Sequence, residues 1–156
     1  MKRFSHSYVR WFSSKFITVA TLLLAAFPCA AAEPSADELL KAIGLKHGLV
    51  VQVGATDGLL AETLAKSETL LVQVLVADAT AEARLRQHFV RAGVHGQATV
   101  GRWSVDGSLP LADQVASIVV ADLDETKLVT PEELFRVLRP LGKGYFKSDG
   151  KWSVVD

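Results

Sequence analysis

The sequence predicts an α/β fold in which helices cover a mainly parallel sheet. Three uncharged apolar runs, at 49–53, 70–77 and 115–121, predict strands that are buried on both faces. The segments between these runs carry apolar residues at the three- and four-residue spacing of a helix. Strands that alternate with helices form βαβ units with right-handed crossovers, and such units build a parallel sheet.

The first 32 residues have the pattern of a secretory signal peptide. Basic residues precede an uncharged stretch that ends in small residues, which is typical of a signal that is cleaved. We therefore expect an exported protein, periplasmic or extracellular, with residues 33–156 as its one folded domain. The alternatives are an uncleaved membrane anchor, which Pro28 disfavours, and a lipoprotein attached through Cys29. The basic residues are Lys2, Arg3, Arg10 and Lys15.

Charge and cysteine content exclude several functions. The chain has 17 basic and 17 acidic residues, so loss of the basic signal leaves an acidic domain. An acidic domain without a basic face is not suited to nucleic acid. The only cysteine, Cys29, lies in the signal, which excludes disulfides and a cysteine nucleophile from the domain. We also expect no metal site, and no membrane span after signal cleavage.

Capping residues mark the ends of the first helices. Ser35 and Glu38 have the spacing of a capping box, and Gly44 provides a left-handed stop for this short helix. After the run at 49–53, a glycine-containing loop opens into the next helix. Thr80 is expected to cap the helix that follows the second run, and Gly93 to stop it.

The carboxyl-terminal part continues the alternation. A short strand is predicted over 97–100, before the run at 115–121. Thr130, followed by proline, begins the last helix, and Pro140 with Gly142 is expected to end it. The residues over 145–155 predict a β-hairpin.

The ends of the predicted strands carry residues suited to a nucleotide-type cofactor. Gly54 and Gly58 lie in the loop after the first run, and Asp78 directly follows the second. In open parallel sheets, ligands lie beyond the carboxyl ends of the strands. Asp78 lies 24 residues beyond Gly54, close to the offset of about 20 residues at which a carboxylate accepts hydrogen bonds from ribose hydroxyls. The alternatives are an ordinary turn for the glycines and a helix cap for Asp78.

Four segments, in order along the chain, resemble the motifs of class I S-adenosylmethionine-dependent methyltransferases. The resemblance implies a Rossmann-like three-layer sandwich of the methyltransferase type, truncated at its carboxyl end. It also implies S-adenosylmethionine as a small-molecule cofactor and methyl transfer to an unidentified acceptor. The matching segments are Val51–Gly58, Asp78, Leu109–Asp113 and Glu133–Gly142.

The resemblance implies roles for individual residues. Backbone in the glycine loop would lie against the methionine part of the cofactor, Asp78 would hold the ribose, and Asp106 or a neighbouring amide would meet the adenine. Asp122, after the strand at 115–121, is the candidate for a base or for orienting the acceptor, with a loop carboxylate as the alternative. The implied cofactor-binding residues are Gly54, Ala55, Asp57, Gly58, Asp78 and Asp106.

Other features favour a second interpretation. Gln52 stands where the family has an acidic residue, and Thr56 stands at the place of a glycine. The segment over 144–152 also resembles the junction in exported proteins that join such a domain to a quinoprotein-like β-propeller. A non-catalytic exported binding module with the same fold is therefore the alternative. Its open sheet edge would take a protein partner or a propeller domain.

Overall fold

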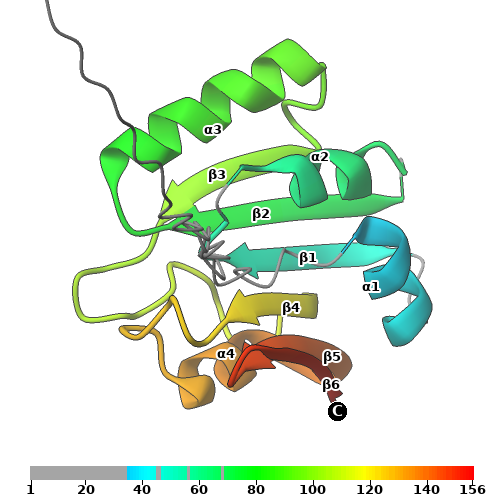
Figure 1. Cartoon of the computed structure of the whole chain (residues 1–156), viewed down its shortest axis with the longest axis vertical. Coiled ribbons are helices and arrows are strands. Elements are labelled where there is room, and N and C mark those ends of the chain that lie inside the picture. The colour runs from blue at the N-terminus through cyan, green and yellow to red at the C-terminus, as the bar shows by residue number, and fades with distance from the viewer. Residues whose placement is uncertain (1–34, 45–46, 56, 68) are drawn as a thin grey trace, which may run out of the picture.

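A computed structural model describes residues 35–44, 47–55, 57–67 and 69–156 (Figure 1). The predicted signal peptide and Thr56 lie outside the described residues. Six strands form one sheet in the order β3-β2-β1-β4-β5-β6, in which only the β5–β6 pair is antiparallel. The strands are β1 (Gly48–Val53), β2 (Leu70–Val76), β3 (Ala98–Arg102), β4 (Ala116–Asp122), β5 (Leu138–Ser148) and β6 (Lys151–Val155).

Helices cover both faces of the sheet, which confirms the predicted three-layer α/β fold (Figure 1). One apolar cluster joins α1, α2 and α3 to alternate residues of β1 and β2, such as Val50 and Val72. A second cluster joins α4 to residues of the opposite face, such as Val51 and Val119. The helices are α1 (Ala36–Ile43), α2 (Leu59–Ala65), α3 (Ala79–Ala92) and α4 (Pro131–Val137).

The capping box predicted for α1 is confirmed, whereas the prediction of Thr80 as the cap of α3 is wrong. The Glu38 amide donates to Ser35 Oγ and the Ser35 amide donates to Glu38 Oε2, both at 3.2 Å. α3, in contrast, is capped by Asp78 rather than Thr80, because its carboxylate accepts from the Thr80 and Ala81 amides at 2.8 Å. Asp78 is the last extended residue before the helix, so Thr80 already has helical geometry and cannot be the cap.

The boundaries of α4 and β3 also differ from the prediction. α4 ends at Val137, ahead of the residues expected to stop it, and β5 begins directly afterwards. Pro140 has no amide hydrogen and disfavours helical geometry in the residue before it, so the chain extends early. β3 spans 98–102 instead of 97–100. The hairpin predicted over 145–155 is confirmed by the antiparallel pairing of β5 and β6.

The loop from β3 to β4 is fixed by two side chains of α4. The Arg136 guanidinium donates to the Leu109 carbonyl at 3.2 Å and to the Leu111 carbonyl at 2.9 Å, and it pairs with Asp113 at 2.5 Å. Glu133 accepts from the Leu109 amide at 2.7 Å and also pairs with Arg136. These residues come from two of the four segments that resemble the methyltransferases. In this structure the two segments bind each other and set the path of the loop.

Replacement of Glu133 by Gln is expected to destabilise the fold in a pH-dependent way. The hydrogen bond from Arg136 lowers the pKa of the Glu133 carboxyl below its ordinary value of 4.5. A carboxyl group whose pKa is lowered by folding stabilises the folded state at pH values above its ordinary pKa. This contribution is lost as the pH falls through the pKa of the folded state. Urea denaturation at neutral pH is expected to show a loss of about 1–2 kcal/mol.

The difference between the original protein and Glu133→Gln is expected to shrink below about pH 4. Glu132→Gln is the matched control, because Glu132 lies on the same turn of α4 and forms no ion pair with Arg136. Hydrogen bonds at the start of the helix also lower the pKa of Glu132, so the contact with Arg136 is measured by the loss that Glu133→Gln shows beyond that of Glu132→Gln. A difference that stays constant between neutral and acid pH would contradict the assignment.

Candidate functional site

The carboxyl ends of the central strands bring most of the predicted residues to one edge of the sheet. Val53 of β1 pairs in register with Leu75 of β2 and Ala121 of β4. The Gly54 amide donates to the Leu75 carbonyl at 2.9 Å, so the turn after β1 begins directly beside β2. The arrowheads of β1 and β2 point to the same edge in Figure 1. Asp78, two residues after β2, and Asp122, the last residue of β4, therefore lie at the ends of strands that flank β1.

The glycine loop after β1 adopts a conformation that its glycines allow. Gly54 and Gly58 have φ angles of 83° and 81°, in the left-handed region that favours glycine. Ala55, between them, is buried. Asp57 accepts a hydrogen bond from the Leu59 amide at 2.9 Å, so its carboxylate stabilises the beginning of α2.

Both glycines pack closely against side chains of the same chain. A Cβ atom at Gly54 would lie 2.4 Å from the methyl carbon of Thr126, and a Cβ atom at Gly58 would lie 2.8 Å from Leu85 Cδ2. Thr126 comes from the loop after β4 and is buried. Its methyl group thus covers part of the surface that a bare glycine turn would offer to a ligand. The Leu85 contact joins the loop to α3.

Asp78 combines a structural contact with spare hydrogen-bonding capacity. Its Oδ1 atom accepts both capping hydrogen bonds from the start of α3. Its Oδ2 atom accepts none from the part of the chain that the structure describes, and the side chain is exposed. An ionised carboxylate can accept about four hydrogen bonds, so the second oxygen is available to hydroxyl groups of a ligand.

Asp122, in contrast, uses both of its carboxylate oxygens within the chain. Oδ2 accepts from the Lys147 ammonium group at 2.7 Å, and Oδ1 accepts from the Asp124 and Glu125 amides at 3.0 and 3.3 Å. The hydrogen bond to Asp122 raises the pKa of Lys147, whose side chain is buried. This ion pair orders the loop after β4.

The same loop carries Thr126 to the glycine turn. The Asp122 carbonyl accepts from the Thr126 amide at 2.9 Å and from the Thr126 hydroxyl at 2.6 Å. Lys147, Asp122 and Thr126 therefore form a continuous chain of contacts that ends at Gly54. The sequence analysis identified neither Lys147 nor Thr126. The ion pair depends on the register of β4 and β5, in which Asp122 lies opposite Lys147, and no local pattern in the sequence indicates that register.

Asp106 lies in the loop between β3 and β4 and forms its hydrogen bonds within that loop. Its carboxylate accepts from the Ser108 amide at 3.1 Å and the Ser108 hydroxyl at 2.8 Å, and these bonds lower the pKa of Asp106. It lines a cavity of about 160 Å³ near the start of α4, which none of the other candidate residues lines. The neighbouring Gly107 is needed because a Cβ atom there would lie 1.9 Å from the Leu128 carbonyl oxygen.

The described ranges contain neither a helix suited to span a bilayer nor a cluster of metal-ligating side chains. None of the helices there has both the length and the apolar character needed to span a bilayer. In the same residues, no group of three histidine, cysteine, aspartate or glutamate side chains is placed to hold a metal ion.

Comparison with solved structures identifies the fold. The chain is similar to a Methanococcus maripaludis protein assigned as an S-adenosyl-L-methionine-dependent methyltransferase, with a TM-score of 0.64 and 19% identity. For a methyltransferase from Aquifex aeolicus, the TM-score is 0.59 and the sequence identity is 24%. For a methyltransferase from Geobacter sulfurreducens, bound to S-adenosyl-L-homocysteine, the TM-score is 0.56 and the sequence identity is 19%. No protein-family model and no curated protein matches the chain.

The structural match covers most of this chain but only part of each neighbour. It includes 71% of the chain in all three cases, and 52%, 61% and 46% of the neighbouring chains. The chain thus spans about half the length of the solved structures that it matches. The likeness shows the Rossmann-like fold of the methyltransferase type.

Gly58→Ala is expected to destabilise the protein more than Gly93→Ala. Both glycines have left-handed φ angles, but a Cβ atom at Gly93 has no neighbour within 4 Å. Gly93→Ala therefore measures the backbone cost alone, about 1 kcal/mol. At Gly58 the contact with Leu85 adds roughly 1–3 kcal/mol. Urea denaturation measures both, and equal losses would show that packing against α3 does not require this glycine.

Proposed function

We propose that this domain binds S-adenosylmethionine at the carboxyl edge of β1 and β2 and transfers its methyl group to an acceptor. One observation carries the proposal. The glycine turn after β1 is hydrogen-bonded directly to β2, and Asp78, two residues after β2, has a carboxylate oxygen that accepts no hydrogen bond from the described residues. This pairing of a glycine turn with an acidic residue suits the ribose of a nucleoside cofactor. The fold shared with methyltransferases supports the proposal.

In this proposal the residues of the edge have separate tasks. The backbone of Gly54, Ala55 and Gly58 would lie against the methionine part of the cofactor, with Asp57 holding the loop at the start of α2. The free Asp78 oxygen would accept from the ribose hydroxyls. Asp106 remains a candidate for the adenine, through the β3–β4 loop.

Methyl transfer requires the protein mainly to position the cofactor and the acceptor relative to each other. The cofactor, when bound, supplies an electrophilic methyl group, and alignment with the acceptor accounts for much of the rate enhancement. Because Lys147 and two amides occupy the Asp122 carboxylate, we assign Asp122 to loop order and not to proton transfer. An acceptor that is already nucleophilic suits such a site.

A second candidate function is a non-catalytic binding module with the same fold. The Thr126 methyl group that covers Gly54 favours it, as does Gln52 in β1, which is only 3% exposed and uncharged. The partner would be a protein or a β-propeller domain at the edge strand β6, whose Lys151, Ser153 and Val154 side chains are exposed. Export through the signal peptide over 1–32 supports this alternative, because S-adenosylmethionine is not expected to be plentiful outside the cytoplasm.

Calorimetric titration of the purified protein with S-adenosylhomocysteine tests the cofactor proposal. Saturable binding is expected, and Asp78→Asn is expected to weaken it at least tenfold, the effect of losing roughly one charge-assisted hydrogen bond. Asp78→Asn retains an oxygen that can cap α3, so its stability is expected to stay near that of the original protein. Asp78→Ala is expected to lose both the affinity and about 1 kcal/mol of stability.

The two variants separate the roles of the residue. If Asp78→Asn bound S-adenosylhomocysteine as tightly as the original protein, Asp78 would be only a helix cap. If the original protein released no heat at high concentration, the methyltransferase proposal would fail and the binding-module alternative would stand.

A further inference from the structure

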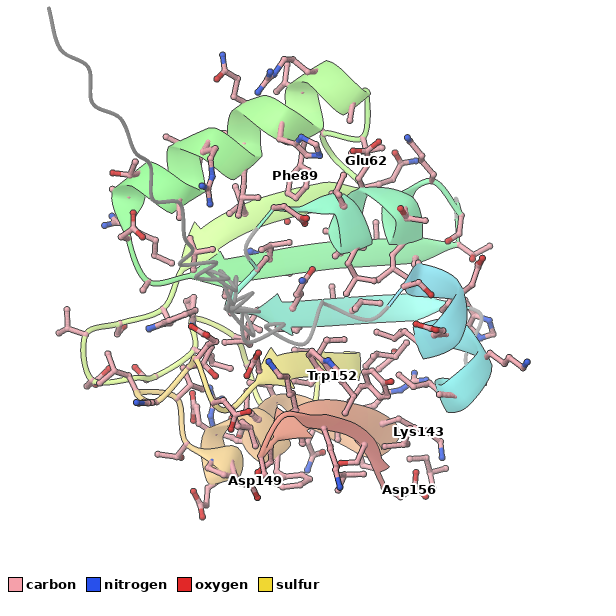
Figure 2. The ribbon with its side chains drawn as sticks, in the orientation of Figure 1. Glu62, Phe89, Lys143, Asp149, Trp152 and Asp156 are labelled. Atoms are coloured by element: carbon pink, nitrogen blue, oxygen red, sulfur yellow. The ribbon has the colours of Figure 1, made fainter. Side chains whose placement is uncertain are left out.

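A second cavity lies at the opposite edge of the sheet, where α4 passes into β5. It has a volume of about 580 Å³. Its walls are mainly apolar, and its charged groups come from the start of β5 and from the residue after β6. Figure 2 shows two of them, Lys143 and Asp156, at the same end of the β5–β6 hairpin, away from Asp149 in the turn. The cavity shares no residue with the candidate cofactor site. The lining includes Phe135, Leu138, Arg139, Pro140, Leu141 and Lys143.

A bulge in β5 builds one wall of this cavity. Ala116 of β4 pairs with Leu138, but Ile118 pairs with Lys143, so residues 139–142 lie outside the regular register. Leu141, within the bulge, has a φ angle of 63° and is 94% exposed. A left-handed conformation is unfavourable for leucine, and exposure of the whole side chain is unfavourable as well. Bulges of this kind often accompany functional sites.

Among the described residues, no acidic side chain forms an ion pair with Arg139. Its Nε atom is buried and has no hydrogen-bond partner there. The residue as a whole is half-buried and lines the cavity, so an anion bound in the cavity would give this cationic side chain a partner.

The other charged groups of the cavity neutralise each other. The Lys143 ammonium group donates to the Asp156 carboxylate, so this pair adds no net charge. Arg139 is therefore the charged residue of the cavity that is available to bind an anion. The planar guanidinium matches a carboxylate, with which it forms paired hydrogen bonds.

We propose that this cavity binds a small apolar carboxylate, such as a medium-chain fatty acid. Its carboxylate would pair with Arg139, and its hydrocarbon part would lie against Phe135, Leu138 and Leu141. The cavity volume lies within the range of about 300–1,000 Å³ for small-molecule sites. Inorganic phosphate would satisfy the charge but would leave the apolar wall exposed to water, so the combination favours a carboxylate with an apolar chain.

Calorimetric titration of the purified protein with octanoate tests this inference. Octanoate is expected to bind saturably, and octan-1-ol is expected to bind at least tenfold more weakly. The affinity of Arg139→Gln for octanoate is expected to fall by about the same factor. Arg86→Gln is the matched control, because Arg86 is an exposed arginine that pairs with Glu82 on α3. It is expected to bind octanoate as the original protein does.

A second variant tests the apolar wall. Leu141→Asn tolerates the left-handed backbone and keeps the fold, but it removes the exposed apolar side chain. It is expected to weaken octanoate binding severalfold. The inference fails if octanoate does not saturate, if octan-1-ol binds equally well, or if Arg139→Gln leaves the affinity unchanged. S-adenosylhomocysteine binding by Arg139→Gln is expected to be unaffected, so failure here is distinguishable from failure of the cofactor proposal.

Discussion

The parallel register of β1 with both of its neighbours determines where the loops of the candidate cofactor site begin. Val53 lies between Leu75 and Ala121, so the chain leaves three adjacent strands at almost the same level. The side chains of β1 from Val50 onwards are buried, and a shift of one residue would exchange the two faces of the strand. This packing makes the register unique. The glycine turn, Asp78 and Asp122 meet at one edge as a consequence of core packing.

The loop after β4 depends on a buried ion pair for its order. Lys147 is nearly inaccessible to water, and its charge is tolerable there because Asp122 accepts its hydrogen bond. Asp122 in turn accepts from two amides of the loop, while its carbonyl holds Thr126. The position of the Thr126 methyl group against Gly54 thus follows from a contact made at the end of β5. The Thr126 methyl group therefore occupies the side of Gly54 on which a Cβ atom would lie.

The sequence predicted local features well and contacts between distant segments poorly. The capping box of Ser35 and Glu38 depends on residues three positions apart, so spacing alone reveals it. Thr80 and Asp78 are both good caps, and the choice between them depends on where β2 ends, which sequence determines only approximately. Lys147 and Asp122 are 25 positions apart, and their contact follows from strand register that no local pattern encodes.

Free hydrogen-bonding capacity separates the residues that order the protein from those that can hold a ligand. At the carboxyl edge, Asp57 and Asp122 use their carboxylates on amides and an ammonium group of the chain, so this edge is stable without a ligand. Within the described residues, the Asp78 Oδ2 atom accepts no hydrogen bond there, and the Arg139 Nε atom has no partner at the opposite edge. The two side chains have opposite charge and lie at opposite ends of the strands. In the two proposals they therefore bind ligands of different chemistry, and the two sites have no lining residue in common.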